Sequence, residues 1–229
     1  MPSTQAPFSP SAFVRETGGS YARELGIDLS GGDPAEIQKW LLAAVLFGAP
    51  IPVGTAVKTY REFERAGLVR FDRIRQAGWH ALVRTLGRGG YARYDFKTAT
   101  KLIEVADRLS LDYGDDANAL HLAAADETDL VRRIRQLGKG IGEVTAGIFL
   151  RELRGVWSKA QPLPSALAVL AAGTLGLVDA GTLDKAEVRQ ALMTLWREDG
   201  MTPETFPEFE TALLRHGATL RRKRTPKPR

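Results

Sequence analysis

The chain has 229 residues, of which 44% are apolar and 26% are charged, and its formal net charge is +5. This length allows one sizeable core or two smaller ones, and the composition is typical of soluble globular proteins. The sequence contains no cysteine, which excludes disulfides, thiolate metal sites, a cysteine nucleophile and a four-cysteine iron–sulfur cluster.

The first half of the chain predicts a flexible start followed by a series of helices. Residues 1–25 mix Pro, Ser, Gly and charged residues without periodicity, which predicts a flexible arm with at most a short helix. Asp33 and Pro34 form a helix-start signal, and apolar residues then recur at helical spacing up to Gly48. Further helices are expected over residues 52–66, 71–77, 79–86, 94–111 and 117–125.

The second half continues the helical pattern. Two helices are expected over residues 126–137 and 142–154, the first of them capped by Asp126. After two interrupting prolines come an apolar segment over 165–175, a helix from Asp184 to Arg197 and a last helix from Pro203 to about Arg215. No segment alternates with a period of two, so the series of about ten short helices predicts an all-α fold.

The C-terminus carries the excess of positive charge. The last nine residues contain six basic residues and no acid, and without them the formal charge of the rest would be −1. We expect residues 218–229 to form a disordered basic tail that binds phosphates without sequence preference. The tail residues expected to bind DNA are Arg221, Arg222, Lys223 and Arg224. A solubilising terminus would have the same composition.

A glycine-rich turn joins the two helices over 126–154. Its sequence is Gly138-Lys139-Gly140-Ile141-Gly142. Glycines permit positive φ and leave successive backbone N–H groups accessible, and the start of the next helix favours an anion. We expect Lys139 to point outward beside this phosphate site and Ile141 to point into the core, while Thr145 is small enough for close helix packing. An ordinary helix ending at glycine is the competing interpretation.

The motif Leu-Gly-Lys-Gly-Ile-Gly-x-x-Thr-Ala, followed by an apolar helix, resembles the helix-hairpin-helix of the endonuclease III (HhH-GPD) superfamily of DNA glycosylases. The resemblance covers residues 37–157 most closely. It implies an all-α, two-lobed fold over residues 26–217, with the hairpin motif at 126–154 and duplex DNA between the lobes. One lobe would contain the central helices and the hairpin, and the other would unite the N- and C-terminal helices.

The resemblance also implies how DNA is held. The DNA-binding residues of the hairpin would be Gly138, Lys139, Gly140, Ile141, Gly142 and Thr145. In the family the hairpin amides hold a DNA phosphate, often with a monovalent cation on the hairpin carbonyls. We expect no other cofactor, and because His80, His121 and His216 lack ligand spacing we expect no metal held by side chains.

The family's catalytic residues do not carry over to this sequence. The lysine nucleophile of endonuclease III immediately precedes the Thr-Ala pair, and that position is Val144, so no lyase activity is expected by the usual route. The essential aspartate would fall at Gln161 or Pro162, in the loop over 157–165, which contains no carboxylate.

Two other carboxylates are candidates for catalysis. Glu143 stands at the start of the second hairpin helix, where the helix dipole holds it ionised, and a plain helix-start acid is the alternative. Asp95 lies at the mouth of a long helix, in a segment that mixes aromatic and basic residues and that could stack on an extruded base. The DNA-contacting residues expected in that segment are Tyr91, Arg93, Tyr94 and Lys97. Packing tyrosines and a first-turn acid explain the same segment equally well.

Ile51 and the tryptophans have weaker functional interpretations. Ile51, in the connection over residues 49–52, is a candidate wedge for the gap left by a flipped base, although a plain interhelical loop fits the same residues. The four tryptophans are expected in the core, and Trp157 is the one that could line a pocket.

These observations leave three hypotheses. The first is a monofunctional DNA glycosylase that flips a base and uses a non-standard carboxylate. The second is a catalytically inactive reader of damaged or distorted DNA. The third, a protein-interaction scaffold, suits the apolar segment 165–177 but leaves the hairpin and the basic tail unexplained.

The sequence also gives an expected location. No apolar run is long enough to span a membrane, and the N-terminus lacks a basic segment followed by an apolar one. We therefore expect a monomeric cytoplasmic protein without a membrane partner, associated with the nucleoid if the organism is bacterial or archaeal.

Overall fold

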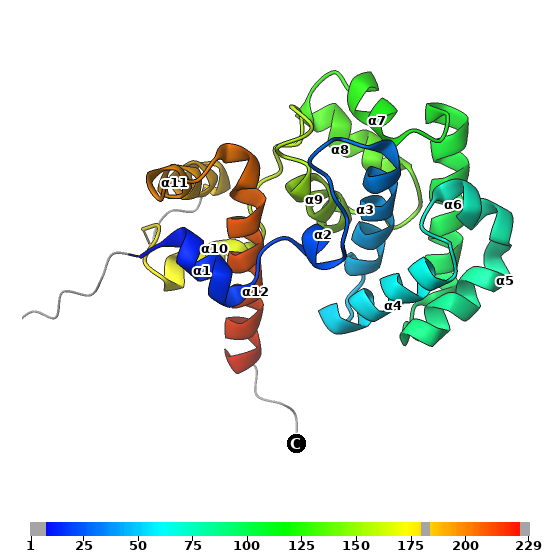
Figure 1. The fold of residues 1–229 in the computed structure, drawn as a ribbon, viewed down its shortest axis with the longest axis horizontal. Coiled ribbons are helices and arrows are strands. Elements are labelled where there is room, and N and C mark those ends of the chain that lie inside the picture. Colours follow the sequence, from blue (N-terminus) through cyan, green and yellow to red (C-terminus); the bar gives the residue numbers. More distant parts are fainter. Residues whose placement is uncertain (1–7, 180–183, 225–229) are drawn as a thin grey trace, which may run out of the picture. The chain divides into compact units, whose positions relative to one another are not determined.

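The computed structural model describes residues 8–179 and 184–224, and every regular element in those two ranges is helical, as predicted. The elements labelled in Figure 1 are α1 (Pro10–Thr17), α2 (Tyr21–Glu24), α3 (Pro34–Phe47), α4 (Val53–Arg65), α5 (Phe71–Gly89), α6 (Asp95–Tyr113), α7 (Ala117–Ala123), α8 (Glu127–Gln136), α9 (Glu143–Glu152), α10 (Ala166–Thr174), α11 (Lys185–Glu198) and α12 (Phe206–Arg224). A short 3₁₀ helix, η1 (Pro203–Thr205), precedes α12.

The chain forms two compact units. The hairpin unit is the continuous segment Glu24–Pro162, and the terminal unit combines Met1–Arg23 with Leu163–Arg229. Within the hairpin unit, α3 is the central helix, and α4, α6, α7 and α9 pack around it (Figure 1). The Asp33 carboxylate accepts the Ala35 and Glu36 amides at the start of α3, and the indole N–H of Trp40 donates to the Phe149 carbonyl at 3.0 Å.

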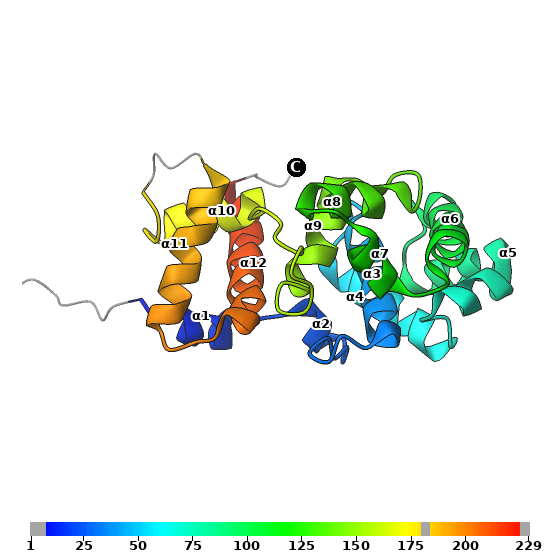
Figure 2. The ribbon, with the colours of Figure 1, turned by 90° about the horizontal axis from the view of Figure 1, so that it is seen from above.

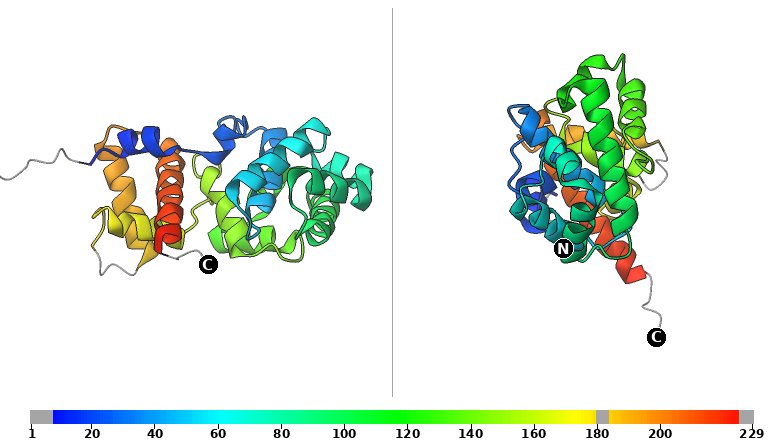
Figure 3. Two further views of the ribbon diagram at one scale, coloured as in Figure 1. Left: turned by 90° about the horizontal axis from the view of Figure 1, so that it is seen from below. Right: turned by 90° about the vertical axis from the view of Figure 1, so that its right-hand side faces the viewer.

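Helices α5 and α6 run side by side in the hairpin unit (Figure 3). Gly78, with φ 73° and ψ 168°, interrupts α5, so its two pieces correspond to the predicted helices over 71–77 and 79–86. The second piece continues to Gly89, three residues beyond the predicted end. There a Cβ would lie 2.3 Å from Thr59 Oγ1, so α4 and α5 approach closely at this glycine.

The terminal unit packs α1, α10 and α11 against α12 (Figure 2). Its core includes the stacked rings of Trp196 and Phe209, whose centroids are 5.6 Å apart. A Cβ at Gly217 would lie 2.0 Å from the Leu167 carbonyl oxygen, so α10 and α12 are in backbone contact at that point. Phe13 on α1 completes the core with an edge-on contact to Phe209.

Both predicted flexible ends differ from the structure. Residues 10–24 of the expected arm form α1 and α2, because Ser9 caps α1 and Phe13 packs against Phe209 and His216. Helix α12 continues to Arg224, so residues 218–224 of the expected tail are helical. Residues 1–7 of the arm and 225–229 of the tail lie outside the described residues.

Candidate nucleic-acid interface

The predicted hairpin is present as α8, a six-residue connection and α9. Gly140 has φ +83°, and a Cβ at Gly138 would lie 3.3 Å from the Lys101 carbonyl oxygen, so each position favours glycine for a different reason. Gly142 has φ −100° and open space where a Cβ would be, so neither backbone conformation nor packing requires glycine there. The turn closes with the Ile141 amide donating to the Gly138 carbonyl at 3.1 Å.

The start of α9 has no side-chain cap. Gly142 is its N-cap residue and supplies no side-chain acceptor, whereas Asp126 caps the preceding helix α8 by accepting the Asp129 amide. The first amides of a helix have no partner within the helix, and the helix dipole makes that end attractive to an anion. Val144, in the first turn of α9, has an exposed fraction of 68%, so this end of the helix reaches the surface.

Two side chains of α6 bracket the turn. The Glu104 carboxylate accepts the Lys139 amide at 2.5 Å, and the Lys101 ammonium donates to the Gly140 carbonyl at 2.9 Å. Burial lowers the pKa of Lys101, and the negative charge of Glu104 opposes that shift. Neither residue was among the expected site residues, although their i, i+3 spacing on one helix indicates that they share a face.

The same contacts bear on the expected monovalent cation. The Gly138 and Gly140 carbonyls both accept hydrogen bonds, and Lys101 already brings a positive charge to the second of them. Each carbonyl oxygen keeps a second lone pair, so the bound cation stays a prediction, with Lys101 as a competing positive charge at Gly140.

A line of basic residues leads along α6 to the hairpin. Lys97 and Lys101 are four residues apart on α6, so their side chains lie on one helical face, while Arg93 lies in the turn before the helix. Arg93 and Lys97 are exposed, and Lys139, in the hairpin turn itself, is exposed as well. Lys101 and Lys139 thus bring two positive charges to the turn that precedes the uncapped start of α9.

The two predicted tyrosines differ in position. Tyr91 has an exposed fraction of 1%, and its hydroxyl donates to the Leu46 carbonyl at 2.7 Å, so the prediction that it contacts DNA is wrong for this structure. The same burial raises the pKa of Tyr91. Tyr94 is half-buried, with the Arg93 guanidinium 5.6 Å from its ring centroid. The exposed aromatic side chain of this segment is instead Phe96.

Two hairpin residues predicted to bind DNA are buried. Ile141 points into the core as expected, so it can offer DNA only its backbone. Thr145 is buried with its hydroxyl against α3, where a Cβ at Gly48 would lie 2.1 Å from Thr145 Oγ1. The expected close approach at Thr145 is therefore made between α9 and the end of α3.

The two candidate catalytic carboxylates lie at helix starts. Asp95 accepts the Phe96 amide at 2.7 Å and is half-buried. Glu143 has a side chain that is 82% exposed and forms an ion pair with Arg135 at 3.5 Å. Asp95 lies at the start of α6 and Glu143 at the start of α9, and neither carboxylate lines the two hollows found beside α6.

The loop after α9 is fixed by hydrogen bonds. Arg154 donates to the Gln161 side chain at 3.1 Å and to the Pro162 carbonyl, the two positions where the family's aspartate would fall. The Trp157 indole is buried, donates to Asn118 at 2.8 Å and stacks on His121. This loop therefore presents amide and backbone groups at the expected catalytic position.

His121 ties the same loop to α7. Its Nε2 lies 3.3 Å from the Ser158 hydroxyl and accepts the Lys159 amide at 3.4 Å, while the Lys159 ammonium donates to the His121 carbonyl at 2.8 Å. Desolvation and the charge of Lys159 lower the pKa of His121.

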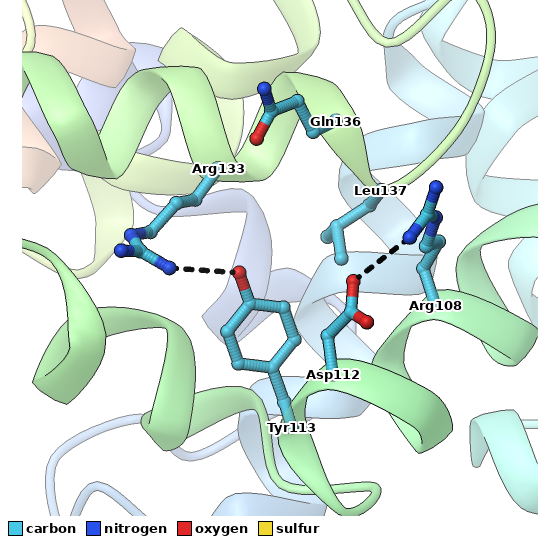
Figure 4. A pocket seen from close by; sticks show the side chains of 6 residues that line it. All are labelled: Arg108, Asp112, Tyr113, Arg133, Gln136 and Leu137. Carbon is cyan, nitrogen blue, oxygen red and sulfur yellow. Dashed lines mark hydrogen bonds and ion pairs between the residues drawn. The ribbon is translucent and has the colours of Figure 1, made fainter.

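The groove between α6 and α8 has mixed charge. A hollow of about 350 Å³ is lined by Arg108, Asp112, Tyr113, Arg133, Gln136 and Leu137. Figure 4 shows that each arginine is already engaged, Arg133 with the Tyr113 hydroxyl at 3.4 Å and Arg108 with Asp112 at 3.2 Å. Toward the hairpin the lining of the groove includes two acids, Glu104 and Asp107, and two basic residues, Arg108 and Lys139.

The remaining predicted residues belong to segments other than the hairpin. Ile51 is half-buried in the connection between α3 and α4, and its amide donates to the Ala49 carbonyl at 2.8 Å. In the terminal unit, Arg221, Arg222 and Lys223 are exposed on the last turn of α12, and Arg224 ends that helix.

Neither a membrane-spanning helix nor a cluster of metal ligands is found in the part of the chain that the structure describes. None of their helices combines the length and apolar character that a membrane crossing requires. No group of three or more His, Cys, Asp or Glu side chains in residues 8–179 and 184–224 is arranged to hold a metal ion. A comparison with protein-family models finds no match, and comparisons with curated proteins and with solved structures also find none.

Proposed function

We propose that this protein binds DNA by holding a backbone phosphate at the start of α9. The observation that carries the proposal is the uncapped N-terminus of that helix, which follows a glycine turn that contains Lys139 and is contacted by Lys101. Backbone amides directed at one point and nearby cations are the combination that binds phosphate in many proteins.

We also propose that the chain is a member of the HhH-GPD superfamily with a two-lobed glycosylase-like fold. Three features support this proposal: the all-helical architecture, the hairpin, and the division of the chain. The central helices and the hairpin form one unit, while the N-terminal segment joins the C-terminal helices in the other, which is the division that the resemblance implies.

Within this superfamily, the geometry favours a reader of damaged or distorted DNA. Gln161 and Pro162 replace the expected aspartate and are held by Arg154, and Val144 replaces the lysine nucleophile. A monofunctional glycosylase is the second candidate. It is favoured by the position of Asp95, which directly precedes Phe96 and its exposed ring.

The phosphate site is tested by Gly142→Asp. The structure has room for the new side chain, which would cap α9 and raise the free energy of unfolding by roughly 0.5 kcal/mol. Because its carboxylate would occupy the amides, affinity for duplex DNA, measured by fluorescence anisotropy, should fall by roughly tenfold or more. A variant that is more stable yet binds more weakly cannot be explained by misfolding.

Gly142→Ala is the matched control. It adds a methyl group in the same open space, leaves the amides of α9 uncapped and should keep the affinity within about threefold of the wild type. Wild-type affinity in Gly142→Asp would remove the hairpin from the proposed interface.

A base-release assay separates the reader from the glycosylase. Duplexes carrying uracil, hypoxanthine, alkylated or oxidised bases, or mismatches are incubated with the wild type, Asp95→Asn and Glu143→Gln. The reader predicts tight binding and no release of any base. Release by the wild type that is lost in one of the two variants would instead establish a glycosylase with a relocated carboxylate.

A further inference from the structure

A partly exposed aromatic pair lies beside the basic residues at the start of α6. Phe96 has an exposed fraction of 59%, and its ring centroid is 5.2 Å from that of Trp79 on α5. His80 packs edge-on against the other side of Trp79 at 5.1 Å. Trp79 is half-buried, which differs from its expected place in the core.

A hydrogen bond holds the Trp79 indole against α6. The Thr100 hydroxyl accepts the Trp79 indole N–H at 3.1 Å and donates to the Phe96 backbone carbonyl within α6 at 3.0 Å. The Trp79 ring is thus held before any ligand arrives, which lowers the entropy cost of stacking on it.

Two neighbouring residues of α6 connect the pair to the hairpin. Thr100 contacts Trp79, and the next residue, Lys101, contacts the Gly140 carbonyl of the turn. A ligand that reaches from the hairpin to the aromatic pair must cross α6, where Lys97 and Lys101 lie. The acid nearest to this path in the sequence, Asp95, is engaged with the Phe96 amide.

We propose that Trp79 and Phe96 form a stacking platform for an unpaired base of the DNA held at the hairpin, an inference that rests on the proposed function. Aromatic rings stack on any nucleobase, and flanking cations hold the backbone. Two rings are too small an area for a stable protein interface, whereas one base covers them. The preferred ligand is therefore a duplex with a short single-stranded stretch.

The tryptophans of the chain give a direct measurement. Trp40, Trp157 and Trp196 are buried, so acrylamide quenching of the intrinsic fluorescence reports mainly on Trp79. Duplex DNA with a three-nucleotide gap should protect Trp79 from acrylamide, and the fully paired duplex should protect it much less. Equal quenching with and without gapped DNA would overturn the proposal.

The matched variants are Phe96→Ser and Phe96→Tyr. Affinity for gapped DNA, measured by anisotropy, should fall about tenfold in Phe96→Ser, stay near the wild-type value in Phe96→Tyr, and change little in either variant for fully paired duplex. An unchanged preference for gapped DNA in Phe96→Ser would overturn the platform.

Gly142→Asp distinguishes failure of the platform from failure of the hairpin site. If Gly142→Asp weakens binding to both DNAs while Phe96→Ser weakens neither, the hairpin function stands and the platform falls. If Gly142→Asp binds both DNAs as the wild type does while gapped DNA still protects Trp79, the platform stands without the hairpin. Absence of binding to gapped DNA overturns both.

Discussion

Glu104 and Lys101 place opposite charges against neighbouring peptide groups of the hairpin turn. The Lys139 amide already donates to the Glu104 carboxylate, so a phosphate at the turn would depend on the amides at the start of α9. The negative charge of Glu104 would then lie near the bound phosphate and repel it. Two charges 4 Å apart interact by about 1 kcal/mol even in water.

Removing that charge should strengthen DNA binding. Glu104→Gln keeps an oxygen that can accept the Lys139 amide, and we expect about fivefold tighter binding to duplex DNA at low salt. Anisotropy titrations measure the change. Glu187→Gln, on α11 in the terminal unit, removes the same charge elsewhere and should have little effect. Equal gains in both variants would show that only net charge matters.

His121 predicts a pH dependence of stability. Desolvation and Lys159 lower its pKa in the folded state, so below about pH 6.5 the unfolded chain binds more protons there than the folded protein. Stability should therefore decrease as the pH falls through the folded pKa of His121. Protonation also removes the Nε2 lone pair that accepts the Lys159 amide.

Urea unfolding at pH 7.5 and at pH 5 tests this dependence. The wild type should lose more stability between the two pH values than His121→Gln, which cannot titrate. The Ala125 amide, and then Arg132 and Arg133, lower the pKa of Asp129. Its contribution to the free energy of unfolding is therefore retained down to about pH 4 and does not differ between the two pH values. An equal loss of stability in the two proteins would show that His121 is not its cause.

At the scale of elements, glycines set the closest helix contacts. A Cβ at Gly217 would lie 2.0 Å from the Leu167 carbonyl oxygen, so Gly217→Ala must separate α10 from α12. We expect a loss of roughly 1–3 kcal/mol in thermal or urea unfolding. Gly173→Ala, on α10 with open space around it, should be neutral or slightly stabilising, since alanine favours a helix. Similar losses in both would refute the packing argument.

Gly48→Ala tests the corresponding contact in the hairpin unit. The new methyl group would collide with the Thr145 hydroxyl, pushing α9 from the end of α3, and we expect roughly 1–3 kcal/mol of destabilisation in urea unfolding. Gly147→Ala, in open space on α9, is the control. If Gly48→Ala unfolds like the wild type, the Thr145 side chain has adopted another rotamer and this contact does not set the distance between α3 and α9.

Local signals predicted the helices well. Asp33, Asp126 and Asp184 each cap the helix that their sequence indicated, and the interruption at Gly78 lies where two pieces were expected. The short helix allowed for in residues 1–25 could not be placed, because α1 has only eight residues and is stabilised by Phe13 packing against Phe209, a residue almost the whole chain away. Such contacts leave no local periodicity.

The candidate site was predicted only in part. Glycine spacing located the turn, because the need for positive φ at Gly140 is a local property. The burial of Tyr91 was not predicted, because its partner Leu46 is 45 residues away in the sequence. Phe96, by contrast, faces away from the buried side of α6 marked by Leu102 and Leu109. Helical spacing alone would have separated Phe96 from that face.

For the molecule as a whole, the excess positive charge lies at the C-terminus. Arg221, Arg222 and Lys223 are exposed on α12, and the last nine residues contain six basic groups. Deleting residues 221–229 should reduce the salt dependence of DNA binding, lowering the slope of log affinity against log salt by roughly 1–3. Deleting only 225–229 should give a smaller change. An unaltered slope in the longer deletion would mean that the terminus only promotes solubility.

The discontinuity of the terminal unit has a consequence for biosynthesis. The hairpin unit is one continuous segment and its sequence is complete at Pro162, whereas α1 acquires its partner α12 only after about two hundred residues have been added. On the ribosome, the hairpin unit can therefore fold while the apolar face of α1 is still without its partner α12. A circular permutant that joins the two ends of this sequence within the terminal unit and opens the chain elsewhere would remove this delay.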